Sequence, residues 1–333
     1  MADNPLKVLM ITTEWPTSAQ PFAAPFVKRQ KEKLEERGIL VEVFHFYGGG
    51  NPLNYLRAWW HVRKRLKNKS FDLVHAQWGQ SAIPALPKLK PLVITYRGDD
   101  LEGVYRDSGG YGLKSSILKW VGRNVARFAD HTILVSKHML KLFTPHSPVD
   151  IIPSGIDFSK IPTQNKLDLR KELGLPSDKR IIIFPNKPQA GRKNYPLVQQ
   201  SFEKLKEKYT DLHLHVIHGV PHEEILKHIK AANFLFFASF HEGSPNVVKE
   251  ALACDTPVVS VPVADVPFRI ADIPGCFLSK DYEVESFVEA AERALSSNYT
   301  NFSSRPYVVE IDDDILSDKL VRIYRTVVEK EQY

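Results

Sequence analysis

Two glutamates with seven residues between them are the most informative polar pair in the sequence. Glu242 precedes a predicted helix and Glu250 lies about two turns inside it. Carboxylates at these two positions can each accept hydrogen bonds from the hydroxyl groups of a polyol. The competing interpretation is an ordinary strand-loop-helix segment whose two glutamates are solvated. The pair alone therefore does not establish a site.

The loop between these glutamates ends in a good helix start. Gly243 is followed by Ser244 and Pro245, residue types that suit an N-cap and a first helical position. The next residues, Asn246, Val247 and Val248, would present free backbone N–H groups at the positive end of the helix dipole. Such a helix start, placed where a buried strand ends, attracts phosphate.

A second polar loop follows another buried strand of the same half. Arg192 and Lys193 stand beside Gly191 in the stretch 185–194. Two adjacent cations can clamp a diphosphate, and an arginine can bind two of its oxygens at once. A basic surface loop is the competing interpretation. Because both loops follow strands of one half, they are expected to converge on one ligand.

The N-terminal half offers weaker candidates. Arg97 and Asp99 flank Gly98 at the end of a predicted strand, where either side chain could reach a ligand. Glu14 and Trp15 follow the first strand and could bind a hydroxyl group and the face of a sugar ring. A plain turn explains the first segment about as well, and the signal from the second is weak.

Metal chemistry is not indicated. The histidines show no spacing typical of a metal site, and the run Asp312–Asp314 is interpreted as the negatively charged start of a terminal helix. We therefore expect neither a metal nor another cofactor.

The segment 54–69 contains six cations, no acid and two tryptophans, Trp59 and Trp60. This composition fits contact with an anionic membrane, and it also fits a surface helix with a basic outer face.

These candidates are positioned by alternating elements. In the first half, strands are predicted at 7–12, 40–44, 73–76, 92–95, 132–135 and 149–152, and helices at 26–37, 54–68 and 114–128. The pattern breaks between Pro153 and Pro176 and then resumes. The second half has predicted strands at 180–184, 212–217, 234–237 and 257–261, and helices at 195–209, 222–231, 247–253 and 315–331.

This alternation predicts an α/β protein with two mostly parallel sheets, that is, two Rossmann-like domains facing a central cleft. The expected boundaries are residues 1–155 for the first domain, 156–314 for the second, and 315–333 for a C-terminal helix that packs back on the first.

Length and composition agree with this. The chain has 333 residues, which suggests roughly two domains, and its 43% hydrophobic and 25% charged residues are ordinary for a globular protein. Only two cysteines are present, which argues against a disulfide framework and for a reducing, cytoplasmic setting. No apolar run approaches the length of a membrane-spanning helix. The net charge of +6 favours an anionic partner.

The chain resembles a family 4 glycosyltransferase of the GT-B fold. The ordered segments Phe71–Gly79, Val93–Asp100, Ala129–Ser136 and Ile151–Asp157 resemble that family's "D-x-V-H-A-H" strand end, its "H-G-x-D" loop and the segments before its linker. Glu242 and Glu250 match its E-x7-E signature.

The resemblance implies transfer of a sugar, with retention at the anomeric carbon, from a nucleotide-diphosphate donor to an acceptor hydroxyl group. Lys193 and Arg192 would neutralise the diphosphate with help from the helix start, Glu250 would hold the ribose, and Glu242 the transferred sugar. Catalytic roles then fall on Glu242, Lys193 and Arg97, without a metal. Glu14, Trp15, Arg97 and Asp99 would lie on the acceptor side.

Four positions depart from the family pattern. Arg97 replaces the histidine of "H-G-x-D", Ala23 or Ala24 stands for a usual glycine after the first strand, and Ala264 stands for another after Val261. Arg192 and Lys193 are adjacent, whereas the family usually separates them, so Lys193 is the firmer assignment.

The predicted function is a retaining hexosyltransferase of glycan or glycolipid assembly, cytoplasmic and in contact with the membrane periphery. Its acceptor would be a glycan, a lipid-linked saccharide or a small molecule. A nucleotide-sugar epimerase or phosphorylase on the same fold, or an inactive nucleotide-sugar-binding protein, are the alternatives. A nucleic-acid partner is not expected, because no recognition motif accompanies the basic charge.

Overall fold

The computed structural model describes residues 5–21, 23–297, 299 and 302–331. The chain divides into two compact units. Unit 1 comprises Met1–Val104, Tyr111–Gly155 and Asp313–Tyr333, and unit 2 comprises Tyr105–Gly110 and Ile156–Asp312. The short segment Tyr105–Gly110, which the sequence interpretation assigned to the first domain, thus belongs to unit 2, and residues 313 and 314 belong to unit 1.

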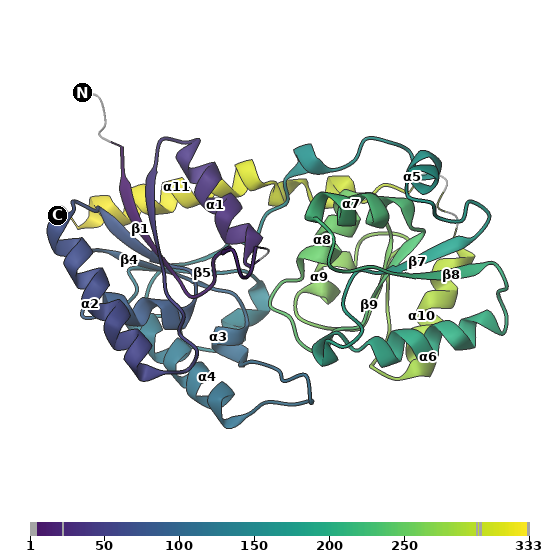
Figure 1. Ribbon diagram of the computed structural model, residues 1–333, viewed down its shortest axis with the longest axis horizontal. Helices are drawn as coiled ribbons and strands as arrows, with labels where there is room; N and C mark the ends of the chain where they lie inside the picture. The colour runs from purple at the N-terminus through teal and green to yellow at the C-terminus, as the bar shows by residue number, and fades with distance from the viewer. Residues whose placement is uncertain (1–4, 22, 298, 300–301, 332–333) are drawn as a thin grey trace. The chain divides into compact units, whose positions relative to one another are not determined.

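Unit 1 is built on a parallel sheet with strand order β2-β1-β3-β4-β5-β6 (Figure 1). Its strands are β1 (Lys7–Thr12), β2 (Leu40–His45), β3 (Leu73–Ala76), β4 (Leu92–Tyr96), β5 (His131–Leu134) and β6 (Val149–Ile151). The central strands β3, β4 and β5 are buried along their whole length, which fits their mostly apolar sequences. The strands predicted for this half are confirmed, with ends shifted by one residue at most.

The helices of unit 1 lie on both faces of the sheet. They are α1 (Pro25–Glu35), α2 (Pro52–Asn68), α3 (Asp99–Glu102), α4 (Leu113–Val125) and α11 (Asp313–Lys330), with 3-10 turns η1 (Gly79–Ala85), η2 (Ala126–Phe128) and η3 (Lys137–Lys141). Ala58 and Val62 of α2 share one hydrophobic core with Leu9 of β1 and Val125 of α4. Figure 1 shows α11 alongside α1, on the other side of the sheet from α2 and α4.

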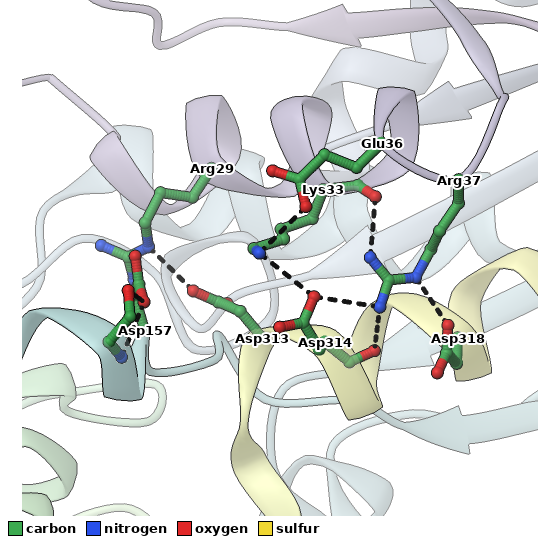
Figure 2. Close-up of polar contacts among 9 residues, drawn as sticks. Arg29, Lys33, Glu36, Arg37, Asp157, Asp313, Asp314 and Asp318 are labelled. Carbon is green, nitrogen blue, oxygen red and sulfur yellow. Dashed lines mark hydrogen bonds and ion pairs between the residues drawn. The ribbon is translucent and has the colours of Figure 1, made fainter.

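Ion pairs fasten α11 to α1 and to Arg37, just beyond the end of α1 (Figure 2). Arg29 Nε lies 3.1 Å from Asp313 Oδ2, and Arg37 Nε lies 2.6 Å from Asp318 Oδ1. Asp314 pairs with both Lys33 and Arg37, each at 3.1 Å. The acidic run therefore does more than start the terminal helix, because it also fixes that helix against α1.

Unit 2 is built on a second parallel sheet, with order β11-β10-β9-β7-β8. Its strands are β7 (Arg180–Phe184), β8 (Leu212–Val216), β9 (Phe234–Phe237), β10 (Val258–Ser260) and β11 (Phe277–Leu278). Its helices are α5 (Lys166–Glu172), α6 (Tyr195–Lys206), α7 (His222–Ala231), α8 (Asn246–Ala253), α9 (Val266–Ile270) and α10 (Val284–Ser296). The remaining 3-10 turns are η4 (Phe158–Lys160), η5 (Gly191–Lys193), η6 (Arg305–Tyr307) and η7 (Val309–Ile311).

Two alanines adopt left-handed backbone conformations that favour glycine. Ala24, at the start of α1, has φ 41°, and Ala264, after β10, has φ 52°. A side chain costs about 1–2 kcal/mol in this region. Of Ala23 and Ala24, Ala24 is therefore the residue whose backbone suits the missing glycine.

Candidate active site

The loop from β9 to α8 carries both glutamates of the E-x7-E pair in buried positions. Glu242 is 9% exposed and Glu250 is 6% exposed, so neither is a solvated surface carboxylate. The helix begins at Asn246, one residue before the predicted range 247–253, and Pro245 rather than Ser244 is its N-cap. Ser244 is not the N-cap, because its hydroxyl group donates to Asp265 Oδ2 at 2.8 Å.

The first turn of α8 consists of Asn246, Val247 and Val248, the residues predicted to start it. Gly243 precedes it in the same loop as Glu242. The helix therefore starts next to a buried carboxylate, at the carboxyl end of a buried strand. A helix start in this place can bind an anion through its N–H groups.

The two cations of the second loop gather around Glu242. Lys193 Nζ lies 2.6 Å from Glu242 Oε1, and Arg192 Nη1 lies 3.6 Å from Glu242 Oε2. The loops are also joined by their backbones, because Phe240 N–H donates to Arg192 O at 2.9 Å. The two loops thus meet within unit 2, and their convergence on one ligand stays a prediction.

Charge neutralisation decides the ionisation state of Glu242. Burial alone would raise its pKa, but Lys193 and Arg192 oppose this, helped by hydrogen bonds from Lys193 and Ser239, and the pKa is lowered below its ordinary value. The carboxylate is therefore a permanent acceptor at neutral pH, able to receive a hydroxyl hydrogen bond.

The conformation of the cationic loop depends on a close backbone approach. Gly191 begins η5, and a Cβ atom there would lie 2.0 Å from the carbonyl oxygen of Asp107. Tyr105 stacks on Phe240, which stacks on Tyr282, with ring centroids 5.6 and 5.5 Å apart. The segment Tyr105–Gly110 thus packs beside both loops, a contribution that the sequence interpretation missed.

Glu250 has a partner that was not predicted. His222, the first residue of α7, places its Nε2 2.8 Å from Glu250 Oε1. The two residues come from different segments of unit 2, and no sequence spacing signals the pair. The contact orients the Glu250 carboxylate from one side.

In unit 1, Arg97 is held by neutral groups. Its guanidinium donates to Gln77 O at 3.1 Å, to the Gln77 side-chain oxygen and to Ser154 Oγ at 3.1 Å. The rings of Phe26 and Trp78 flank it at 4.6 and 5.5 Å. Burial lowers the pKa of Arg97 to about 10, although the charges of Asp100 and Glu14 oppose the change. At neutral pH the group remains a half-buried cation.

A narrow cavity of about 20 Å³ adjoins Arg97, with Thr95, Gln30 and Ser154 in its lining. This volume corresponds to roughly one water molecule. The arginine thus borders a polar space within unit 1.

Asp100, rather than Asp99, organises this loop. The Asp100 carboxylate accepts hydrogen bonds from the backbone N–H groups of Gly79, Arg97 and Gly98 at 3.0–3.1 Å. Burial raises its pKa to about 6, while these backbone bonds lower it. Asp99 lies in the first turn of α3. The final aspartate of the "H-G-x-D" pattern was the signal for Asp100.

The other two acceptor-side candidates, Glu14 and Trp15, are more exposed than Asp100. Glu14 is exposed, and its backbone N–H and carbonyl groups both bond to the Thr12 hydroxyl, at 3.2 and 2.6 Å. Trp15 is partly exposed. The Glu14 charge acts on Arg97 by opposing the fall in the arginine pKa.

Among the residues that the structure describes, no cluster of three or more potential ligands could hold a metal ion. Within the same residues, no helix combines the length and apolar character needed to cross a bilayer.

Comparison with known proteins agrees with this geometry. Residues 7–160 match Glycosyltransferase Family 4, and residues 182–297 match Glycosyl transferases group 1. The chain therefore belongs to the family 4/group 1 glycosyltransferases with the GT-B fold, and it is a nucleotide-sugar glycosyltransferase.

One relative is TuaC of Bacillus subtilis (strain 168), a glycosyltransferase assigned to teichuronic acid biosynthesis. It is 22% identical, over 78% of this chain and 82% of TuaC.

Two solved structures share the fold. Sucrose-phosphate synthase from Thermosynechococcus elongatus has a TM-score of 0.78 at 15% identity, over 98% of this chain and all of the other. Anabaena HepE, in complex with UDP and glucose, has a TM-score of 0.70 at 15% identity, over 95% of this chain and 98% of the other. The predicted fold class is confirmed.

Proposed function

We propose that this glycosyltransferase transfers a hexose from a uridine-diphosphate donor, with retention, to an acceptor hydroxyl group in polysaccharide or glycolipid assembly. The observation that carries the proposal is the gathering of Arg192 and Lys193 on the buried Glu242, beside the first turn of α8. The TuaC relationship supports a glycan product, and HepE, which binds UDP-glucose, supports the donor class.

On binding, the donor diphosphate would replace Glu242 as the ion-pair partner of Lys193 and Arg192. These cations and the N–H groups of Asn246–Val248 would stabilise the charge that develops on the leaving diphosphate, which is the largest contribution a buried site of this kind can make. No metal is needed for this step in the proposal, because the side-chain cations supply the positive charge.

Glu242, released from Lys193, would accept hydrogen bonds from the transferred sugar. Glu250, oriented by His222, would hold the ribose. Arg97, together with Asp99, Glu14 and Trp15, would serve the acceptor side. We place the reaction in the cytoplasm. Nucleotide sugars occur there, and its reducing conditions fit the free thiols of Cys254 and Cys276.

The test is a thermal-shift screen of uridine, guanosine, adenosine and thymidine diphosphate sugars, followed by turnover measurements. We expect a uridine-diphosphate hexose to raise the melting temperature. Glu242→Ala is expected to abolish turnover, and Lys193→Ala to weaken the donor-induced shift, because each removes half of the buried pair. Product analysis with and without an acceptor separates transfer from epimerisation.

The matched control is the Lys204–Glu285 pair, an exposed contact of 2.7 Å in unit 2. Lys204→Ala and Glu285→Ala are expected to leave turnover and donor binding unchanged. Full turnover in Glu242→Ala, with its fold intact by circular dichroism, would contradict the assignment.

A further inference from the structure

The helices α2 and α4 of unit 1 each carry an outward stripe of large apolar side chains. On α2 the stripe is Leu53, Leu56 and Trp60, which are 61%, 61% and 55% exposed. On α4 it is Leu113, Ile117 and Trp120, which are 81%, 57% and 67% exposed. At 100° per residue, both stripes point away from the core residues of the same helix, such as Val62 and Val125.

The two stripes belong to one side of the molecule. Both helices pack on η1 and contribute to the same hydrophobic core beneath the sheet. Figure 1 shows them together on the side of the unit 1 sheet opposite α11. Because both helices turn their core residues toward η1 and the sheet, the two stripes lie on the outer side of the same helical layer.

Exposed cations accompany the apolar side chains. These are Arg57, Lys64, Lys67, Lys114, Arg123 and Arg127, and none of them forms a salt bridge within the described part of the chain. Lys64 Nζ lies 5.4 Å from the centre of the Trp60 ring. We name these six cations and the six apolar residues above the α2/α4 surface.

The charge of the chain is concentrated here. Residues 52–68 contain five cations and residues 113–128 contain four, with no acid in either stretch. Because the whole chain has a net charge of +6, the remaining residues together carry a net charge of −3. The excess positive charge is therefore carried by α2, α4 and the turn η2 that follows α4.

We propose that the α2/α4 surface binds the surface of a bilayer containing anionic lipids. The aliphatic side chains would enter the boundary between headgroups and acyl chains, the tryptophans would lie at the level of the headgroups, and the cations would contact lipid phosphates. The cations alone would suit any polyanion. The exposed leucines and isoleucine beside them favour a partner that also offers an apolar phase, which a bilayer does.

Two other occupants fit less well. A second copy of the chain would place this cationic surface against another, at an electrostatic cost. A nucleic acid would pair with the cations and stack on the tryptophans, yet it would leave Leu53, Leu56, Leu113 and Ile117 in water.

The experiment is co-sedimentation of the full chain with vesicles of phosphatidylcholine alone or with 30% phosphatidylglycerol, at low and high salt. We expect binding to the anionic vesicles that weakens as salt increases. Lys64→Gln/Arg123→Gln should weaken it about fivefold for each cation removed. Trp60→Gln/Trp120→Gln should weaken it by about tenfold or more, because it removes interfacial anchors.

The controls lie in unit 2. Phe268→Gln removes an apolar side chain that is 71% exposed, and Lys171→Gln/Lys206→Gln removes two exposed cations. Both should bind vesicles like the unmodified protein. The donor-induced thermal shift should persist in all variants, so that failure of this proposal is distinguishable from failure of the proposed function.

Absence of vesicle binding, or equal losses in the controls, would overturn the proposal. So would a dimer that Trp60→Gln/Trp120→Gln dissociates, or tight binding of a single-stranded oligonucleotide without vesicle binding, because each assigns the surface to another partner.

Discussion

His75 should make unit 1 sensitive to mild acid. It is fully buried in β3, with Nδ1 2.6 Å from the Tyr324 hydroxyl group and Nε2 2.8 Å from Thr95 Oγ1. Burial, and then the charge of Arg97, lower the pKa of His75 to about 3 from an ordinary value of 6.5. The native protein therefore keeps this imidazole neutral at pH values where the unfolded chain protonates it.

The sign and size of the effect follow from proton linkage. The stabilisation is complete above pH 6.5 and is lost as the pH falls toward 3, because only the unfolded state binds the proton in that window. Each pH unit is worth about 1.4 kcal/mol, so about 2 kcal/mol of unfolding free energy should be lost between pH 7 and pH 5.

The Asp100 carboxyl titrates in the opposite sense. Its pKa is raised to about 6 in the native state, so unit 1 gains stability from this group as the pH falls below 6. The gain partly cancels the loss from His75 in the unmodified protein. Since a His75→Gln variant retains Asp100, the difference between the two proteins isolates the histidine.

The assay is urea unfolding followed by tryptophan fluorescence at pH 7 and pH 5. All five tryptophans lie in unit 1, at positions 15, 59, 60, 78 and 120, so the signal reports on this unit. His75→Gln is expected to lose about 2 kcal/mol less than the unmodified protein over this pH interval.

Equal pH losses in the two proteins would refute the reasoning. His146→Gln, a change at an exposed histidine of the same unit, should behave like the unmodified protein. Tyr324→Phe removes one hydrogen bond but not the titrating group, so it should lower stability by about 1 kcal/mol at pH 7 and retain the pH dependence.

Three further outcomes are expected. Ala264→Gly should raise the calorimetric stability of unit 2 by up to about 1 kcal/mol, because it relieves a left-handed backbone; Ala264→Val should lower it. Gly191→Ala should speed hydrogen exchange in residues 105–110, since its Cβ would strike Asp107; unchanged exchange would contradict the close approach. Glu242→Gln should lose less stability than the unmodified protein as the pH falls below about 4.5, because the lowered pKa of Glu242 makes its contribution disappear in acid; parallel stability curves from pH 6 to 3 would argue against this.

The periodicity of the sequence was sufficient for every strand except β11, whose two residues are too few to show a pattern. Strands such as Lys7–Thr12 and Phe234–Phe237 were predicted with their observed ends, because short continuous apolar runs are typical of parallel strands buried on both faces. Helix α10 was missed, although its apolar residues Phe287, Ala290, Ala291 and Ala294 recur at helical spacing. Three of these four residues are alanines, whose weak hydrophobicity makes the apolar face of a helix harder to recognise than one of leucines and valines.

The site was predictable to the extent that it lies in consecutive residues. Glu242 and Lys193 could be singled out because each follows a strand of the same sheet. The Glu250–His222 pair and the packing of Gly191 on Asp107 could not, because these contacts join segments 28 and 84 residues apart with no spacing rule. Ser244 was misplaced by one position, because its hydroxyl group bonds to Asp265 instead of capping α8.

The chain leaves unit 1 after Gly155 and re-enters it at Asp313, and these two points are neighbours. A Cβ atom on Gly155 would lie 2.2 Å from Asp313 Oδ1, and Ile156 forms a bridge with Asp312. In topological terms, residues 156–312 are an insertion between the sixth strand and the last helix of unit 1, whose chain is interrupted elsewhere by Tyr105–Gly110. A truncation at residue 155 would remove Tyr324 from His75, whereas joining residue 155 to residue 313 through a short linker should yield a shortened protein that retains the whole first sheet with its closing helix.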